Sequence, residues 1–166
     1  MGASAKFADG GKKTAKKDLG RLMMTYPNVY VASVAMGANP AQLMKAVTEA
    51  VAHKGPSIVI AYCPCLEQHI KAGMGCSQTE MKKAVECGYW NMFRFNPALK
   101  AEGKNPFTLD SKAPAGGYQE FLMNEARYSR LTREFPDRAE ALFARNEEEA
   151  KNRYEHLLKL IEMYDK

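Results

Sequence analysis

The residues of this chain that could do chemistry are its thiols. Its 166 residues include four cysteines, Cys63, Cys65, Cys76 and Cys87. A thiolate can bind zinc or an iron–sulfur cluster, or exchange with a disulfide. Cys63 and Cys65 stand closest together, with only Pro64 between them. Because the chain shows no export signal, we expect free thiols or metal ligands rather than a disulfide framework.

Spacing alone leaves several interpretations of these thiols open. Structural zinc needs four ligands, usually in two close pairs, whereas Cys76 and Cys87 are isolated. A thiol–disulfide redox site has two residues between its cysteines, beside a helix amino terminus. An iron–sulfur ligand next to a proline is a known arrangement, but one cysteine cannot hold a cluster. Spacing therefore favours the simplest interpretation, a small buried residue at the end of a strand.

The histidines add little to this candidate site. His53 lies near the carboxyl terminus of an expected helix, where its charge suits the helix dipole, and is predicted to be structural. His156 lies beside the apolar side of the last expected helix and is predicted to be structural or exposed. His69, four residues beyond Cys65, is the histidine nearest the thiols, and no role is assigned to it. Residues 73–75 lack the spacing of a phosphate loop and predict a turn.

The segments before the thiols predict a βαβ unit. Residues 29–34 and 57–62 are apolar, β-branched runs typical of strands buried on both faces. Asn39 and Pro40 predict the start of a helix between them, which Gly55 and Pro56 end. The two strands should then be parallel. Since ligands of open parallel sheets bind beyond the carboxyl ends of the strands, the Cys63–Cys65 pair is selected.

Two parallel strands would leave both edges of the sheet unpaired, so we expect neighbouring strands from outside this chain. The first residues of the chain also resemble the interior of a domain rather than its start. Both features predict that the 166 residues are part of a longer polypeptide.

Helical patterns flank the βαβ unit on both sides. Helices are expected from about Thr14 to Tyr26 and from Gln78 to about Glu86. Residues 89–117 are punctuated by prolines and predict an irregular arm whose aromatic side chains pack on a larger body. One or two helices should follow up to Glu134, and a long one should open at Pro136. Its charged pairs at four-residue spacing predict a solvated face: Glu147/Lys151, Glu149/Arg153 and Glu155/Lys159.

Composition narrows the class of protein. With 46% hydrophobic and 26% charged residues, and no apolar run of membrane-span length, the chain reads as soluble. We expect it in the cytoplasm, with an organelle as the alternative in a eukaryote, and we expect no membrane partner. Much of the net charge of +5 comes from the first 26 residues. This basic segment predicts a solvated helix or contact with an acidic protein, because the aromatic or arginine-rich groove of a nucleic-acid site is lacking.

Several blocks of sequence resemble one enzyme family. Residues 28–38 and 55–65 contain the two expected strands and resemble the end of the thiamine-binding domain of pyruvate:ferredoxin (flavodoxin) oxidoreductases. The resemblance continues, in order, through four further blocks: residues 84–90, 103–107, 109–112 and 119–122. The long single-chain members of that family resemble this sequence better than the multi-subunit ones, because the aromatic arm and the terminal helices are present.

This resemblance implies an α/β fold and an oxidoreductase. Such enzymes decarboxylate pyruvate on thiamine diphosphate with Mg²⁺, pass electrons through 4Fe–4S clusters to ferredoxin or flavodoxin, and transfer the acetyl group to coenzyme A. They are typically homodimers. Residues 1–88 would complete the thiamine-binding domain, 89–117 would form the arm and 118–166 a helical segment; the isolated piece would be inactive. A second hypothesis is a non-catalytic α/β module that binds a protein partner through its basic end and its arm.

The resemblance assigns a role to Cys65 alone. In the family, the cysteine of this Pro-Cys step is the fourth ligand of the 4Fe–4S cluster nearest the thiamine, and the other ligands lie upstream. The other three cysteines match positions that are not ligands. The thiamine and magnesium motifs are expected before Met1, so no residue here is expected to bind that cofactor or to be catalytic. Where the family commonly has His-Gly after the ligand, this sequence has Gln68-His69-Ile70.

Overall fold

The computed structural model describes residues 1–165, which fold as α/β, as predicted. Their strands are β1 (Tyr30–Val34), β2 (Ser57–Ala61), β3 (Phe93–Phe95) and β4 (Phe107–Leu109). The helices are α1 (Leu19–Met24), α2 (Pro40–Ala52), α3 (Ser77–Glu86), α4 (Ala98–Ala101), α5 (Tyr118–Asn124), α6 (Ala126–Glu134) and α7 (Pro136–Tyr164), with a short 3-10 turn, Met74–Cys76, before α3. No helix of the described residues is long and apolar enough to cross a membrane.

The predicted parallel pair of strands is confirmed. β1 pairs with β2 in parallel from Tyr30 opposite Ser57 to Val34 opposite Ala61. The helix between them, α2, begins as expected: Asn39 is the N-cap, its side chain accepts a hydrogen bond from the backbone of Gln42, and a proline follows. These local signals place the carboxyl ends of β1 and β2 side by side.

Burial of the two strands differs from the prediction. All five residues of β1 are buried, as expected for the centre of a sheet. In β2, Ser57, Val59 and Ala61 are exposed and the two residues between them are half-buried, so the prediction of burial on both faces is wrong for this strand. The reason is that β2 is the outermost strand of the described sheet and has a neighbour on one side only.

The segment 89–117, predicted to be irregular, contains two short strands. β3 pairs antiparallel with β1, and β4 pairs antiparallel with β3, giving the strand order β2-β1-β3-β4. Asn96 and Pro106 join across the connection through a backbone hydrogen bond of 2.8 Å. One sheet edge that was expected to be open is therefore paired within this chain. The division of the chain at residues 88 and 117 stays a prediction.

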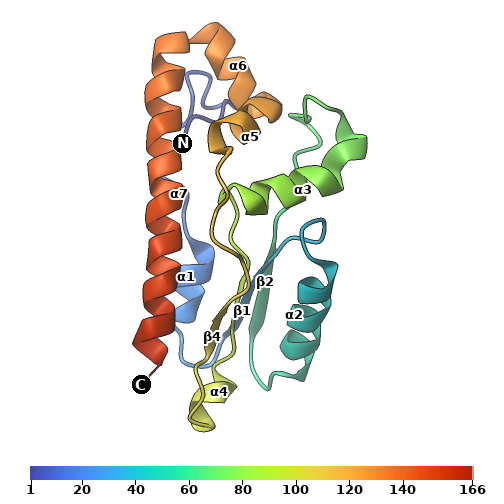
Figure 1. Cartoon of the computed structure of the whole chain (residues 1–166), viewed down its shortest axis with the longest axis vertical. Coiled ribbons are helices and arrows are strands. Elements are labelled where there is room, and N and C mark those ends of the chain that lie inside the picture. The colour runs from blue at the N-terminus through green and yellow to red at the C-terminus, as the bar shows by residue number, and fades with distance from the viewer. Residues whose placement is uncertain (166) are drawn as a thin grey trace.

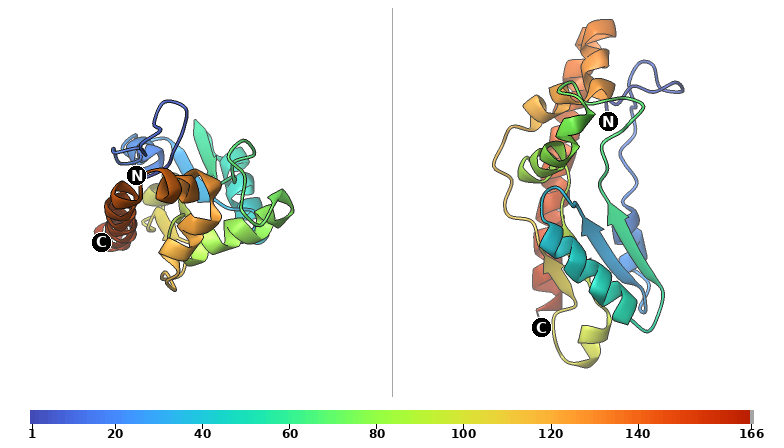
Figure 2. Two further views of the ribbon diagram at one scale, coloured as in Figure 1. Left: turned by 90° about the horizontal axis from the view of Figure 1, so that it is seen from above. Right: turned by 90° about the vertical axis from the view of Figure 1, so that its right-hand side faces the viewer.

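Helices cover both faces of the sheet (Figure 1, Figure 2). Tyr30, Ala32 and Val34 of β1 face α2 and pack on its Ala46. The opposite face carries the aromatic residues of β3 and β4 and packs against α1 and the end of α7. The first helix is shorter than predicted because it begins at Leu19, where the side chain of Asp18 caps it by accepting from the backbone of Arg21 at 2.9 Å.

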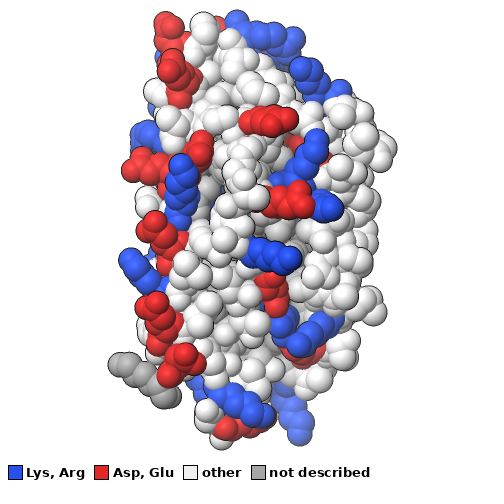
Figure 3. All heavy atoms as spheres, in the orientation of Figure 1, with Lys and Arg blue, Asp and Glu red and all other residues white. Residues whose placement is uncertain are grey.

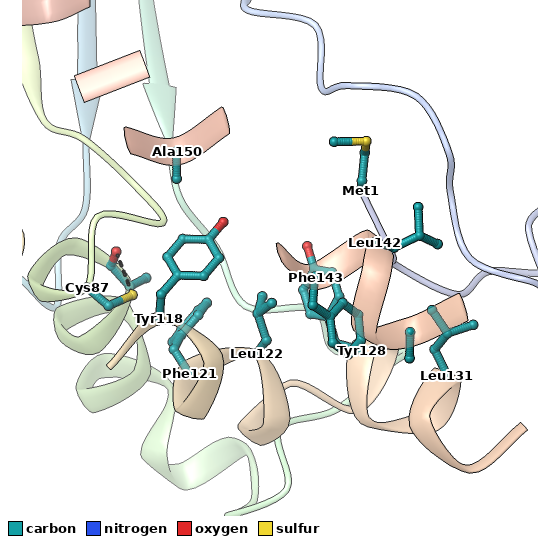
Figure 4. Close-up of a cluster of buried hydrophobic side chains, with 12 residues drawn as sticks. Met1, Cys87, Tyr118, Phe121, Leu122, Tyr128, Leu131, Leu142, Phe143 and Ala150 are labelled. Carbon is teal, nitrogen blue, oxygen red and sulfur yellow. Dashed lines mark hydrogen bonds between the residues drawn. The ribbon is translucent and has the colours of Figure 1, made fainter. Parts of the chain in front are cut away.

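A second core lies beyond the sheet, where α5, α6 and the first residues of the chain pack on α7 (Figure 4). Tyr118, Leu122, Leu131 and Phe143 are among its buried members. Met1 is also buried there, with 6% of its surface exposed. The predicted helices after Gly117 are confirmed as α5, α6 and α7. This core packs α5 and α6 on α7 and so positions the junction between α5 and α6.

The exposed side of α7 carries interspersed acidic and basic side chains (Figure 3). Of the three ion pairs predicted there, Glu147 and Lys151 approach to 3.1 Å. Arg153 does not pair with Glu149 but points inward, donating to the carbonyl oxygen of Tyr89 at 2.8 Å and to the side chain of Asn91 at 3.1 Å. It also donates to the carbonyl oxygen of Gly88 at 3.2 Å, and two carbonyl acceptors and one amide hold the guanidinium more firmly than one exposed carboxylate would.

Candidate functional site

The Cys63–Cys65 pair follows β2 directly, at the carboxyl ends of the two parallel strands. The backbone N–H of Tyr62 continues the pairing by donating to Val34 at 3.0 Å. After it the chain leaves the sheet, and residues 63–70 form a loop. The position expected from the sheet topology is therefore the observed one.

The four thiols have different environments, and all are free. Cys63 is exposed and Cys65 is partly exposed, so the prediction of a small buried residue at the strand end is wrong for both. Their exposure follows from the position of β2 at the sheet edge. Cys76 is exposed on the turn before α3. Cys87 is buried, and burial raises the pKa of its thiol to about 11, so it stays protonated and unreactive.

The loop after Cys65 is closed against the α5–α6 junction by hydrogen bonds at both ends. At its start, the hydroxyl of Tyr62 donates to the carboxylate of Glu125 at 3.1 Å. At its end, Lys71 donates its backbone N–H to Asn124 at 2.8 Å, and Ala126 donates to the carbonyl of His69 at 3.2 Å. The carboxylate of Glu125 thus holds the start of this loop, and the backbone of its two neighbours, Asn124 and Ala126, holds the end.

His69 is the one non-glycine residue of the described chain with a positive φ, 62°. Its backbone N–H donates to the carbonyl of Cys65 at 3.0 Å, which turns the loop back on itself. Residues in this left-handed region are strained unless the surroundings hold them, and such strain is concentrated at functional sites. His53, in contrast, ends α2 and contacts the carbonyl of Asn28 at 3.0 Å, which is a structural role.

Glu125 is the buried charge of this site, with 2% of its surface exposed. Burial raises the pKa of its carboxyl, although Arg127, at 3.4 Å, and the Tyr62 hydroxyl act in the opposite direction. Burial also disfavours the charged form of Arg127, but Glu125 and, more weakly, Tyr89 and Cys65 raise its pKa overall. Arg127 is therefore the counterion of Glu125 at this site.

Sequence reasoning selected Cys65 but missed the residues that hold its loop. Tyr62 and Glu125 are 63 residues apart in sequence, and no local pattern links them. The sequence carries no signal for this junction, because α5 and α6 meet at Glu125 without a glycine or proline to mark the turn.

The described residues do not assemble a metal site by themselves. Among residues 1–165, no three His, Cys, Asp or Glu side chains are grouped so that they could hold a metal ion. Cys65 can serve as one ligand, because its thiol is free and partly exposed on a fixed loop. A metal or cluster bound there would need its remaining ligands from other polypeptide.

Comparison with known proteins gives close relatives for nearly the whole chain. The chain is 56% identical over 161 residues to pyruvate:ferredoxin oxidoreductase of Moorella thermoacetica and 53% identical over 154 residues to pyruvate-flavodoxin oxidoreductase of Klebsiella pneumoniae. It is 45% identical over 161 residues to the mitochondrial pyruvate dehydrogenase (NADP+) of Euglena gracilis. These alignments cover 97%, 93% and 95% of this chain. No family model matches the chain.

The relatives are much longer than this chain, which spans 14%, 13% and 9% of their respective lengths. Their names support the oxidoreductase hypothesis and disfavour a stand-alone interaction module. Similarity at this level over almost every residue means that the chain is homologous to one segment of the pyruvate:ferredoxin and pyruvate-flavodoxin oxidoreductases.

Proposed function

We propose that this chain is the carboxy-terminal segment of a pyruvate:ferredoxin or pyruvate-flavodoxin oxidoreductase, and that Cys65 supplies one ligand of a 4Fe–4S cluster. The observation that carries the proposal is the position of Cys65: a free, partly exposed thiol at the carboxyl end of β2, on a loop that the α5–α6 junction holds at both ends. The similarity to oxidoreductases along the whole chain supports the enzyme class.

The residues of this chain fit one ligand of such a cluster and no more. When bound, the cluster would supply one-electron transfer. Around it, Tyr62 and Glu125 would keep the loop in one conformation, so that the thiolate of Cys65 meets its metal without rearrangement. Arg127 would act as the counterion of Glu125 and so help to keep the carboxylate that holds Tyr62. The remaining ligands, and the thiamine diphosphate and Mg²⁺ sites, would lie elsewhere in the complete protein.

The relatives suggest which part of the reaction this segment serves. One is named for ferredoxin, another for flavodoxin and a third for NADP, yet all share the segment at 45–56% identity. A segment that bound the final electron acceptor would be expected to differ among them. We therefore assign the segment to the early part of electron transfer, next to the thiamine, with ferredoxin or flavodoxin binding at another part of the protein.

Further parts of the proposal concern the complete protein. We propose that it is a homodimer acting on pyruvate and coenzyme A, in which residues 1–88 complete the thiamine-binding domain. The 166 residues alone would then be inactive, because one cysteine cannot hold a cluster. The exposed face and free edge of β2 would be covered by neighbouring polypeptide.

Replacing Cys65 in the complete protein tests the proposal. Cys65→Ala should remove or destabilise one cluster, lowering the iron content by up to about four atoms per chain. Electron paramagnetic resonance should show the loss of one cluster signal, and pyruvate-dependent reduction of a viologen dye should fall. Cys76→Ala is the matched control, since it removes another exposed thiol and should leave iron unchanged. Unchanged iron and electron transfer in Cys65→Ala would refute the assignment.

A further inference from the structure

A cavity of about 680 Å³ lies beside the site, between the first residues of the chain, the ends of β1 and β2, and α7. Met1, Tyr118 and Tyr128 form part of its wall (Figure 4). One side of α7 contributes a row of polar residues to the lining, among them Asn146 and Arg153. The cavity therefore combines an apolar, partly aromatic wall with a row of polar side chains, and Cys65 is not among its lining residues.

Hydrogen-bond donors without partners gather around this cavity. Asn91 is 5% exposed and its Oδ1 accepts from Arg153 at 3.1 Å, which fixes the orientation of the amide. Asn146 is 9% exposed and its Oδ1 accepts from the backbone nitrogen of Met1 at 3.0 Å. Within the described chain, the Nδ2 groups of both residues have no acceptor. Both amides thus present a buried, unused N–H₂ group.

Arg127 adds a third such donor. Its Nε lies 3.4 Å from Glu125, yet this contact lacks the geometry of a hydrogen bond, and within residues 1–165 the buried Nε has no hydrogen-bond partner. Five buried side-chain atoms of the described chain lack partners, and the three that are donors all belong to residues lining this one cavity. Their concentration in one place indicates that the cavity is built around an acceptor.

The charge of the lining indicates that the acceptor is an anion. Five cationic side chains line the cavity (Lys16, Lys17, Arg21, Arg127 and Arg153) against two acidic ones, Asp18 and Glu149. The ammonium of Lys16 lies 5.4 Å from the ring centre of Trp90. Desolvation lowers the pKa of Lys16, and so do the neighbouring charges of Arg153, Arg127 and Lys12. Water could accept from the two amides, but water would not relieve this repulsion between cations.

We propose that this cavity binds an oxyanion, a carboxylate or phosphate group of a small molecule, with the amides of Asn91 and Asn146 donating to its oxygens. Arg127 and Lys16 would supply the countercharge, and the aromatic wall would take an apolar part of the same molecule. The proposal does not depend on Cys65 being a cluster ligand, because none of its donors belongs to the Cys65 loop.

Isosteric variants of the complete protein test the site. Asn91→Asp and Asn146→Asp each keep the Oδ1 atom that is already used, and they replace the free donor by a negative charge. Inorganic phosphate and acetate are titrated separately by calorimetry at low ionic strength. We expect wild type to bind at least one of them, and each variant to bind about tenfold more weakly or not at all. Tighter binding of phosphate would identify a phosphate site, and tighter binding of acetate a carboxylate site.

Asn152→Asp is the matched control. Asn152 also lines the cavity from α7 but is exposed, so the same change of charge is screened by solvent and should alter binding less than about threefold. Hydrogen exchange of α7 without added anion reports whether the variants are folded. The proposal is overturned if wild type binds neither anion, or if the buried Asp variants bind as well as the Asn152→Asp control.

Discussion

Arg94 and Glu125 are both buried charged side chains that join distant parts of the chain, but they are satisfied to different degrees. Arg94, which is 9% exposed, donates to both carboxylate oxygens of Asp110 at 2.9 Å and to Glu49 on α2 at 2.7 Å. Glu125, which is 2% exposed, receives one hydrogen bond from Tyr62 at 3.1 Å and has one counterion, Arg127, at 3.4 Å.

This difference separates a structural cluster from a candidate functional one. The hydrogen bonds that Arg94 donates to Asp110 and Glu49 outweigh burial and raise the pKa of Arg94, so its charge is stable where it stands. For Glu125, the effect of burial on the pKa is larger than that of its partners, so ionisation of the carboxyl costs free energy in the folded state. Buried charges that are incompletely compensated are concentrated at functional sites, and this one holds the start of the Cys65 loop through Tyr62.

The largest effect is expected from removing Arg94. Arg94→Met keeps much of the side-chain volume but leaves the half-buried carboxylates of Asp110 and Glu49 without their cation. Breaking a buried ion pair in this way costs about 3–5 kcal/mol. We expect faster hydrogen exchange in α2 and β4 of the complete protein, since Arg94 joins these two elements across the sheet.

Lys104→Met is the control for Arg94→Met. Lys104 also forms an ion pair, with Glu102 at 2.7 Å, but both side chains are exposed. Its loss should leave exchange unchanged throughout the sheet. An equal response to the two variants would show that the Arg94 cluster is no stronger than a surface pair, and the contrast with Glu125 would fail.

Glu125 should make stability depend on pH. Because burial raises the pKa of its carboxyl above the ordinary 4.5, the folded state binds this proton more tightly than the unfolded chain does. The stabilising contribution is therefore fully present below pH 4.5 and is lost as the pH rises through the folded-state pKa. Glu125→Gln resembles the protonated form, so its stability relative to wild type should increase as the pH rises from 4.5 to 8.

Protection factors for α5 and α6, measured by hydrogen exchange at several pH values, check this prediction. The pKa of Glu80 is raised by burial and, more weakly, by the charge of Glu125, so the comparison is made in a Glu80→Gln background, where that carboxyl no longer titrates. A difference between Glu125→Gln and wild type that does not change with pH would mean that the Glu125 carboxyl is fully compensated.

Local sequence patterns predicted the parts of the fold that depend on neighbouring residues. The N-cap at Asn39, the parallel strands and the long helix opening at Pro136 all follow from such signals. β3 and β4 were missed because three residues are too few to show a period, and because their pairing joins segments separated by α4. The predicted burial of β2 was too high because the apolar residues of a strand indicate burial in the complete protein. Polypeptide outside this chain can contribute to that burial.

The candidate site was also predictable only in part, because some of its contacts join residues that are distant in sequence. Topology selects the strand end that carries Cys65, since the rule needs nothing but the order of strands and helices. Glu125, Tyr62 and Arg127 meet through the packing of α5 and α6, and the sequence gives no local sign of that contact. In sequence, nothing distinguishes the charged residues around Arg94 from those around Glu125. Only the hydrogen-bond geometry shows that Arg94 is fully compensated and Glu125 is not.

The smallest effect, and the sharpest comparison, comes from removing one hydroxyl from each cluster. Tyr62→Phe and Tyr30→Phe each delete a hydroxyl that donates to a carboxylate, at 3.1 Å to Glu125 and at 2.9 Å to Glu49. Each loss should cost about 1 kcal/mol. Glu49 keeps Arg94 as a close partner, whereas Glu125 keeps only the longer contact to Arg127.

Tyr62→Phe should therefore have the larger effect of the two, and it should raise the pKa of Glu125 further because a bond that favours the carboxylate is lost. The aromatic ring stays in place against Trp90, so packing is unchanged. Hydrogen exchange of residues 63–70 in the complete protein should quicken in Tyr62→Phe and not in Tyr30→Phe. If both variants leave that loop equally protected, the backbone bonds at Asn124 and Ala126 hold it alone, and Glu125 has no part in positioning Cys65.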